Sequence, residues 1–231
     1  MTDLGTLGTD DLSYNFAHEL RVPLLRIARL AELHQHNEKL DYVSVETIAD
    51  SALKLLDGFL LSARLKNQQI DLALEPVSIS ATMYDVAHYL DKLAKAQNCE
   101  LRLRVQRKSG LVLAQANGVK AALLSLCYGF LHATDPLHKS IITMDAHKQH
   151  NVVLAGLTSF DVRLDKSVMN RAKPIAGSAY QSIKDLPTSG AGFFIAANLF
   201  DAMTVPLKII QSSRQFGMMG VFQPSKQLRL L

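Results

Sequence analysis

The sequence predicts an α+β protein made of a helical hairpin over residues 1–67 and a two-layer α/β sandwich over residues 70–231. Two observations carry this prediction. Apolar residues recur with helical spacing through the N-terminal part, whereas helical and alternating segments interleave after residue 70. With 48% hydrophobic and 20% charged residues, the chain of 231 residues has the composition of a globular protein that buries a core.

The hairpin carries an apolar seam of the kind found in helical bundles. Its members are spaced alternately three and four apart: Ala17, Leu20, Leu24, Ile27, Ala31 and His34 in the first arm, and Val45, Ile48, Ala52, Leu55 and Phe59 in the second. The polar stretch 35–42 predicts the turn between the arms. One hairpin cannot bury two such seams well, so we expect a homodimer that completes a four-helix bundle. The alternative is that the hairpin packs against the rest of its own chain.

The sandwich opens with residues 70–79, which alternate and contain Pro76, and this pattern predicts a short strand. Ser80 is the expected N-cap of a helix that reaches Ala96. Further strands are predicted at 99–105, 111–114, 140–145, 152–157, 207–211 and 220–223, and further helices at 117–134 and 190–203. Residues 158–188 lack periodicity and predict a long irregular connection.

The charge pattern argues against two classes of partner. The net charge of +4 is mild and its basic residues are dispersed, so we expect no nucleic-acid surface. No apolar run approaches the ~20 residues that span a bilayer, so we expect no membrane partner.

Cys99 and Cys127 lie in apolar surroundings without metal-ligand spacing, which predicts reduced buried thiols in a cytoplasmic protein. The histidines lack the cysteine or carboxylate partners that would complete a metal site, so no metal ligands are predicted.

The most informative segment is Phe16-Ala17-His18-Glu19-Leu20-Arg21-Val22-Pro23-Leu24. His18 directly follows the seam position Ala17, so it should lie on the flank of the bundle. An exposed imidazole can accept a phosphoryl group, and Glu19 is placed to accept the proton that leaves it. Pro23 cannot donate a hydrogen bond to the Glu19 carbonyl, so the helix should bend just after this pair. On this segment alone, a solvated surface pair remains the more common interpretation.

The order of elements resembles the cytoplasmic core of the sensor histidine kinases along nearly the whole chain. His-Glu-Leu-Arg-Val-Pro-Leu lies on the first helix of a hairpin, and an α/β sandwich follows. The resemblance implies that residues 1–67 form the dimerisation and phosphoacceptor hairpin and that residues 70–231 form a sandwich of the histidine kinase ATPase type. It also implies that His18 is the phosphoacceptor, with Glu19 as its acid/base partner.

The nucleotide-binding half departs from the pattern of this family. The resemblance assigns the two asparagines that serve magnesium and phosphates to positions 125 and 129, which are Ser125 and Gly129 here. A hard cation needs oxygen ligands, and Gly129 has no side-chain oxygen. The Asp-x-Gly-x-Gly box that should follow a strand is also missing, because no glycine occurs between Asp161, its nearest stand-in, and Gly177.

The last box is partly retained. Gly190 and Gly192 resemble the Gly-x-Gly turn that opens the final helix and approaches phosphates. They are weak remnants of a cofactor-binding site, and a loop-to-helix junction kept for folding is the favoured interpretation. Val22 occupies the position where many family members carry a Thr or Asn that orients a hydrolytic water, so the resemblance implies loss of phosphatase activity.

These features together predict a histidine phosphotransfer protein, similar to phosphotransferases with a degenerate ATPase domain. His18 is expected to take phosphate from one response-regulator receiver domain and to pass it to another. No cofactor is expected. Two alternatives stay open: a divergent kinase that uses ATP and magnesium to phosphorylate His18 on its own, and a scaffold that binds partners without phosphotransfer.

Overall fold

The computed structural model describes residues 24–25, 27–32, 42–106, 110–135, 137–162, 191–212 and 215–225. Residues 24–25 and 27–32 are helical and belong to the first arm of the predicted hairpin. The second arm is the long helix α2 (Tyr42–Lys66), as predicted. In the part of the chain that the structure describes, no helix is both long and apolar enough to cross a membrane.

A five-stranded sheet forms one layer of the α/β sandwich. Its strands are β2 (Cys99–Val105), β4 (Ser140–Gln149), β5 (Val152–Ser159), β7 (Phe216–Phe222) and β6 (Leu207–Gln211), in that order across the sheet. Only β2 and β4 pair in parallel; the other neighbours are antiparallel. This mixed sheet confirms the α+β class predicted from the alternating segments.

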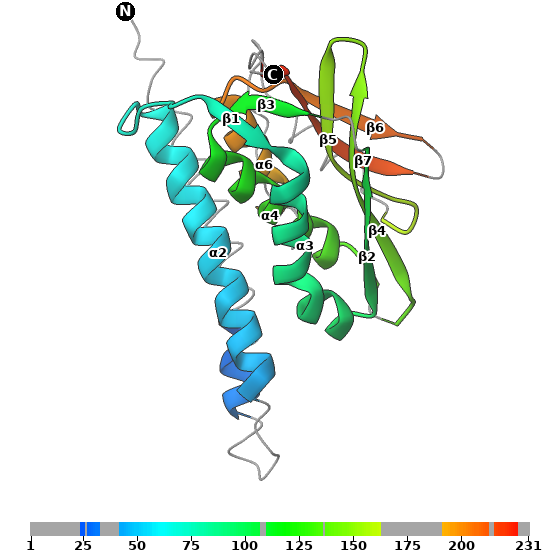
Figure 1. Ribbon diagram of the computed structural model, residues 1–231. Coiled ribbons are helices and arrows are strands. Elements are labelled where there is room, and N and C mark those ends of the chain that lie inside the picture. The colour runs from blue at the N-terminus through cyan, green and yellow to red at the C-terminus, as the bar shows by residue number, and fades with distance from the viewer. Residues whose placement is uncertain are drawn as a thin grey trace, which may run out of the picture.

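The second layer consists of helices on one side of that sheet (Figure 1). They are α3 (Ile79–Ala96), α4 (Ala116–His132) and α6 (Ala191–Ala202). A two-stranded ribbon of β1 (Glu75–Ser78) and β3 (Leu111–Ala114) closes one end of the sandwich. Alternate residues of β4, such as Ile142, Met144 and Ala146, are fully buried against the helices, which explains why period-two patterning predicted this strand.

Several boundaries differ from the sequence prediction. Helix α3 begins at Ile79, and its N-cap is Ser78, not Ser80, because the Ser78 hydroxyl accepts a hydrogen bond from the Ala81 N–H. The strand before it is confined to Glu75–Ser78, shorter than the predicted 70–79. Strand β7 starts at Phe216 instead of residue 220. Gly217, which precedes the predicted strand, lies inside β7, where a Cβ would come 2.7 Å from Thr158 Cγ2.

The core lies between the sheet and the helices and is rich in aromatic rings. Phe130, Phe193 and Phe216 pack with ring centroids 5.2–5.7 Å apart. Both cysteines are free and buried, as predicted, and burial raises the pKa of the Cys99 thiol to about 11. Burial also raises the pKa of the Cys127 thiol.

Helix α2 packs against α4 and α6, on the side of the helix layer that faces away from the sheet (Figure 1). Its residues Leu55 and Leu65 join the same hydrophobic core as the sandwich. The second arm therefore packs on its own chain, which is the alternative that the apolar seam left open. The four-helix bundle remains a prediction.

Candidate functional site

The predicted phosphoacceptor pair His18 and Glu19 lies outside the described residues, as do Val22 and Gly190. The structure does describe the other positions that the family resemblance singled out. Ser125 and Gly129 lie on α4, Gly192 lies in the first turn of α6, and Asp161 follows β5. Three of these four residues meet at one place in the molecule.

Gly192 brings the backbone of α6 into direct contact with that of α4. A Cβ atom built on Gly192 would lie 2.2 Å from the carbonyl oxygen of Ser125 and 2.4 Å from the backbone nitrogen of Gly129. A Cβ on Gly129 would in turn lie 3.0 Å from the backbone nitrogen of Phe193. Only glycine at these positions lets the two helices approach this closely.

The two positions expected to serve magnesium and phosphate are therefore packed against protein. Ser125 is 2% exposed. Its hydroxyl would lie 3.1 Å from a Cβ on Gly58 of α2, and the methyl Cγ2 of Ile195 is equally close to that Cβ. Since Gly129 supplies no side-chain oxygen and Ser125 faces α2, this pair offers no open oxygen ligands. The described residues also contain no group of three or more His, Cys, Asp or Glu side chains that could hold a metal ion.

Asp161, the nearest stand-in for the missing Asp-x-Gly-x-Gly aspartate, is bound to the sheet. Its carboxylate Oδ2 accepts a hydrogen bond of 2.8 Å from the Ile141 N–H, and its own N–H donates to Ser159 Oγ at 3.1 Å. The Ser159 hydroxyl donates to the Ile141 carbonyl at 2.8 Å. These three bonds tie the start of β4 to the end of β5. The Asp161 carboxylate thus has a structural partner that accounts for its position.

A polar cluster joins α2 to the sandwich near residue 50, and sequence patterns did not predict it. The Tyr89 hydroxyl of α3 donates to the Asp50 carboxylate of α2. The pKa of Tyr89 is raised to about 12, mainly by partial burial and secondly by this hydrogen bond to Asp50. Tyr128 of α4 is 1% exposed, and its hydroxyl interacts with the side chains of Ser51 and Tyr89. Burial is the main reason that the Tyr128 pKa is raised.

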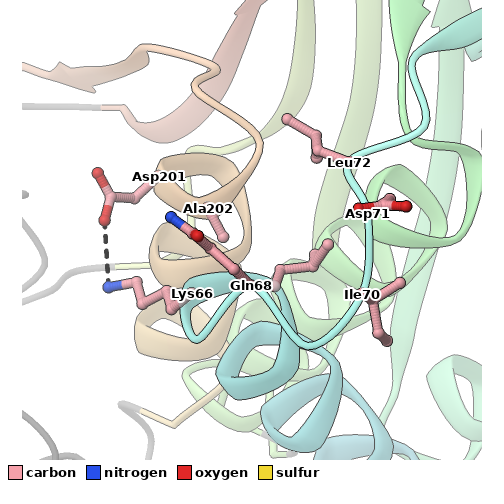
Figure 2. A pocket seen from close by; sticks show the side chains of 8 residues that line it. Lys66, Gln68, Ile70, Asp71, Leu72, Asp201 and Ala202 are labelled. Atoms are coloured by element: carbon pink, nitrogen blue, oxygen red, sulfur yellow. Dashed lines mark ion pairs between the residues drawn. The ribbon is translucent and has the colours of Figure 1, made fainter.

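A second polar contact lies at the C-terminal end of α2, beside an open pocket of about 580 Å³. Lys66 Nζ donates to Asn198 Oδ1 at 2.6 Å and forms an ion pair with Asp201 Oδ2 at 3.1 Å, both on α6. Figure 2 shows this ion pair at the rim, with the segment from Gln68 to Leu72 forming the opposite wall. Lys66 and Asn198 are separated by 132 positions in the chain, so no local pattern predicts this contact.

The sequence matches no protein-family model and no curated protein. Solved structures, however, resemble the chain closely in fold. The Acinetobacter baumannii histidine kinase AdeS shares 12% identity at a TM-score of 0.62, over 89% of this chain and 97% of that one. The histidine kinase ThkA, solved in complex with the response regulator protein TrrA, shares 13% identity at a TM-score of 0.61, over 98% of this chain and 64% of that one.

A third similar structure is that of a bacterial phosphotransferase, with 13% identity and a TM-score of 0.50 over 95% of this chain and 98% of that one. At such identities the likeness concerns the fold and assigns no residue a role. This likeness in fold agrees with the mixed sheet, the helix layer and the long helix α2 described above. The chain therefore has the fold of a histidine kinase core.

Proposed function

We propose that this protein is a histidine phosphotransfer protein of a two-component phosphorelay. In this proposal His18 accepts phosphate from the receiver domain of one response regulator and passes it to another. ATP does not serve as the donor. The contact between α4 and α6 is the observation that carries the proposal, because Gly192 lies against Ser125 and Gly129, where the family resemblance places the ligands of magnesium and phosphate.

The proposed reaction moves one phosphoryl group between a carboxylate and an imidazole. The P–O bond of an aspartyl phosphate on the receiver breaks, a P–N bond forms to a ring nitrogen of His18, and the receiver carboxylate leaves. The attacking ring nitrogen uses its free lone pair, and Glu19 accepts the proton that the other ring nitrogen releases. The reverse sequence delivers the phosphoryl group to the second receiver.

A labelled receiver domain tests this assignment. Wild-type protein mixed with a receiver that carries a labelled aspartyl phosphate should become labelled, and the variant His18→Ala should not. His88 lies exposed on α3 and gives a matched control, because His88→Ala should be labelled to the same extent as wild type. Equal labelling of wild type and His18→Ala contradicts the proposal.

An ATP-dependent histidine kinase is the second candidate, and two of the similar structures, AdeS and ThkA, are histidine kinases. It predicts a measurable heat of ATP binding in calorimetry with magnesium present, together with label on His18 from ATP. The third candidate is a scaffold without phosphotransfer. It predicts that His18→Ala still binds its partners and still supports their cellular output.

We also propose that the protein is a homodimer that works in the cytoplasm, where receiver domains are its partners. Among the described residues of the two hairpin helices, four leucines remain exposed in the single chain: Leu24 59%, Leu25 55%, Leu53 57% and Leu60 41%. Leu53 and Leu60 are seven residues apart on α2, so they lie on the same side of the helix. A second copy that completes a four-helix bundle would bury them.

A further inference from the structure

Helix α2 contacts the sandwich at three separated levels. In the N-terminal half of α2, Asp50 and Ser51 contact Tyr89 of α3 and Tyr128 of α4. We call these four residues the tyrosine cluster. The cluster joins one helix of the hairpin to two helices of the sandwich.

The middle of α2 approaches the helix layer most closely at Gly58. A Cβ on this residue would lie 3.1 Å from both Ser125 Oγ of α4 and Ile195 Cγ2 of α6. The next apolar anchor, Leu65, is 7% exposed and belongs to the core of the sandwich. This face of α2 is therefore packed as part of the core at these two positions.

The C-terminal end of α2 is bound by Lys66, which reaches both Asn198 and Asp201 of α6 (Figure 2). Asn198 is itself held, since its Nδ2 donates to the Phe194 carbonyl at 2.9 Å. Specific polar contacts thus occur at both ends of the packed face. Directional polar contacts at two ends add to the apolar packing in fixing the position of a helix along its axis and its rotation.

We infer that α2 and the sandwich move as one rigid body, with the tyrosine cluster and Lys66 holding the hairpin helix at a fixed position on α3, α4 and α6. The helix that carries half of the hairpin is then an integral part of the sandwich, and the segment after Lys66 does not act as a hinge. A partner bound to the hairpin meets the sandwich at a constant distance. This inference does not depend on whether His18 carries phosphate.

Distance measurements between two spin labels test the rigid body in the full-length protein. The variants Glu46→Cys on α2 and Lys208→Cys on β6 place labels at two exposed positions, while Cys99 and Cys127 are buried. The labelled protein is mixed with an excess of unlabelled wild type, so that distances between two copies do not contribute. One narrow distance distribution is then expected. A broad or two-peaked distribution in the otherwise unchanged protein overturns the inference.

Removing hydroxyl groups tests the role of the tyrosine cluster. In the double variant Tyr89→Phe with Ser51→Ala, amide hydrogen exchange along the N-terminal half of α2 should accelerate at least fivefold, while β4 and β5 keep their exchange rates. Tyr84→Phe is the matched control, because Tyr84 is 58% exposed on the same helix and has no side-chain partner among the residues that the structure describes. It should leave all exchange rates unchanged.

Two results of the exchange experiment contradict the inference. Unchanged exchange in α2 means that the cluster does not hold the helix. Equal acceleration in α2 and in β4 and β5 means that the substitutions weaken the whole fold and that the cluster has no specific role between hairpin and sandwich.

Discussion

At the scale of single residues, Gly192 controls how closely α6 approaches α4. A side chain there would meet backbone atoms of Ser125 and Gly129 within 2.8 Å, and backbone cannot move aside as a flexible side chain can. The same contact underlies the proposal that this protein does not use ATP as its donor. The packing of this one residue therefore bears on the stability of the fold and on the proposed function.

Gly192→Ala should lower the free energy of unfolding by about 1–3 kcal/mol, because overpacking outweighs the better helix propensity of alanine. Urea denaturation followed by circular dichroism measures it. Gly58→Ala is the matched control. Its Cβ would meet only the side-chain atoms of Ser125 and Ile195, both at 3.1 Å, so the loss should be clearly smaller. Equal losses for the two variants contradict the backbone contact at Gly192.

Gly192 also shows what the sequence could predict at this scale. The sequence identified it as a remnant of a Gly-x-Gly turn and favoured a role in folding. The close approach of α6 to α4 at Gly192 gives a physical reason for this role in folding. The partner residues on α4, however, lie more than 60 positions away in the chain, and no spacing rule predicts them. His18 and Glu19, predicted from the motif, remain predictions until phosphotransfer is measured.

At the scale of elements, the end of α6 stores backbone strain. Thr204 has a φ of 55°, in the left-handed region that β-branched residues rarely adopt. The Thr204 N–H donates to the Asp201 carbonyl and the Val205 N–H to the Phe200 carbonyl, which is the Schellman pattern that usually places glycine at this position. The helix thus ends with a favourable hydrogen-bond pattern and an unfavourable residue.

Thr204→Gly should raise the free energy of unfolding by about 1 kcal/mol, because glycine adopts a positive φ without steric cost. Thermal unfolding of the variant and wild type measures the change. Asn98 follows α3 with a φ of 52° and gives the comparison, since asparagine already tolerates this conformation. Asn98→Gly should therefore gain less. A loss of stability in Thr204→Gly would mean that the threonine side chain makes a contact worth more than the strain.

The hairpin helices give a second prediction at this scale, on the proposed homodimer. Replacing Leu53 and Leu60 by aspartate should halve the molar mass measured by light scattering, from twice 25.5 kDa to 25.5 kDa, because buried charges would face each other in the bundle. Leu137→Asp is the control, as Leu137 is 85% exposed in the turn before β4. A monomeric wild-type protein, or a double variant that stays dimeric, contradicts this bundle.

At the scale of the whole molecule, the order of helices and strands was predictable, whereas their docking was not. Period-two alternation located β2 and β4, and helical periodicity located α2, α3 and α4, because local burial repeats at these spacings. The same periodicity shows that α2 has an apolar face without showing what covers it. That face packs on α4 and α6, and the residues that fix it there, Lys66 and Tyr89, carry no signal in the sequence.

The packed helix layer and the retained His18-Glu19 pair lead to one picture of the molecule. The sandwich has the fold of a histidine kinase core, and its glycine contact occupies the place where the resemblance locates the nucleotide ligands. In the proposed function, phosphate reaches His18 only from another protein. The sandwich then contributes a rigid surface beside the hairpin.

The source of the phosphate on His18 distinguishes a phosphotransfer protein from a kinase. Full-length protein is incubated with magnesium and γ-labelled ATP in one sample, and with a receiver domain that carries a labelled aspartyl phosphate in the other. Label is expected on His18 from the receiver and none from ATP. Label from ATP on wild type but not on His18→Ala would contradict this expectation and identify the protein as a kinase.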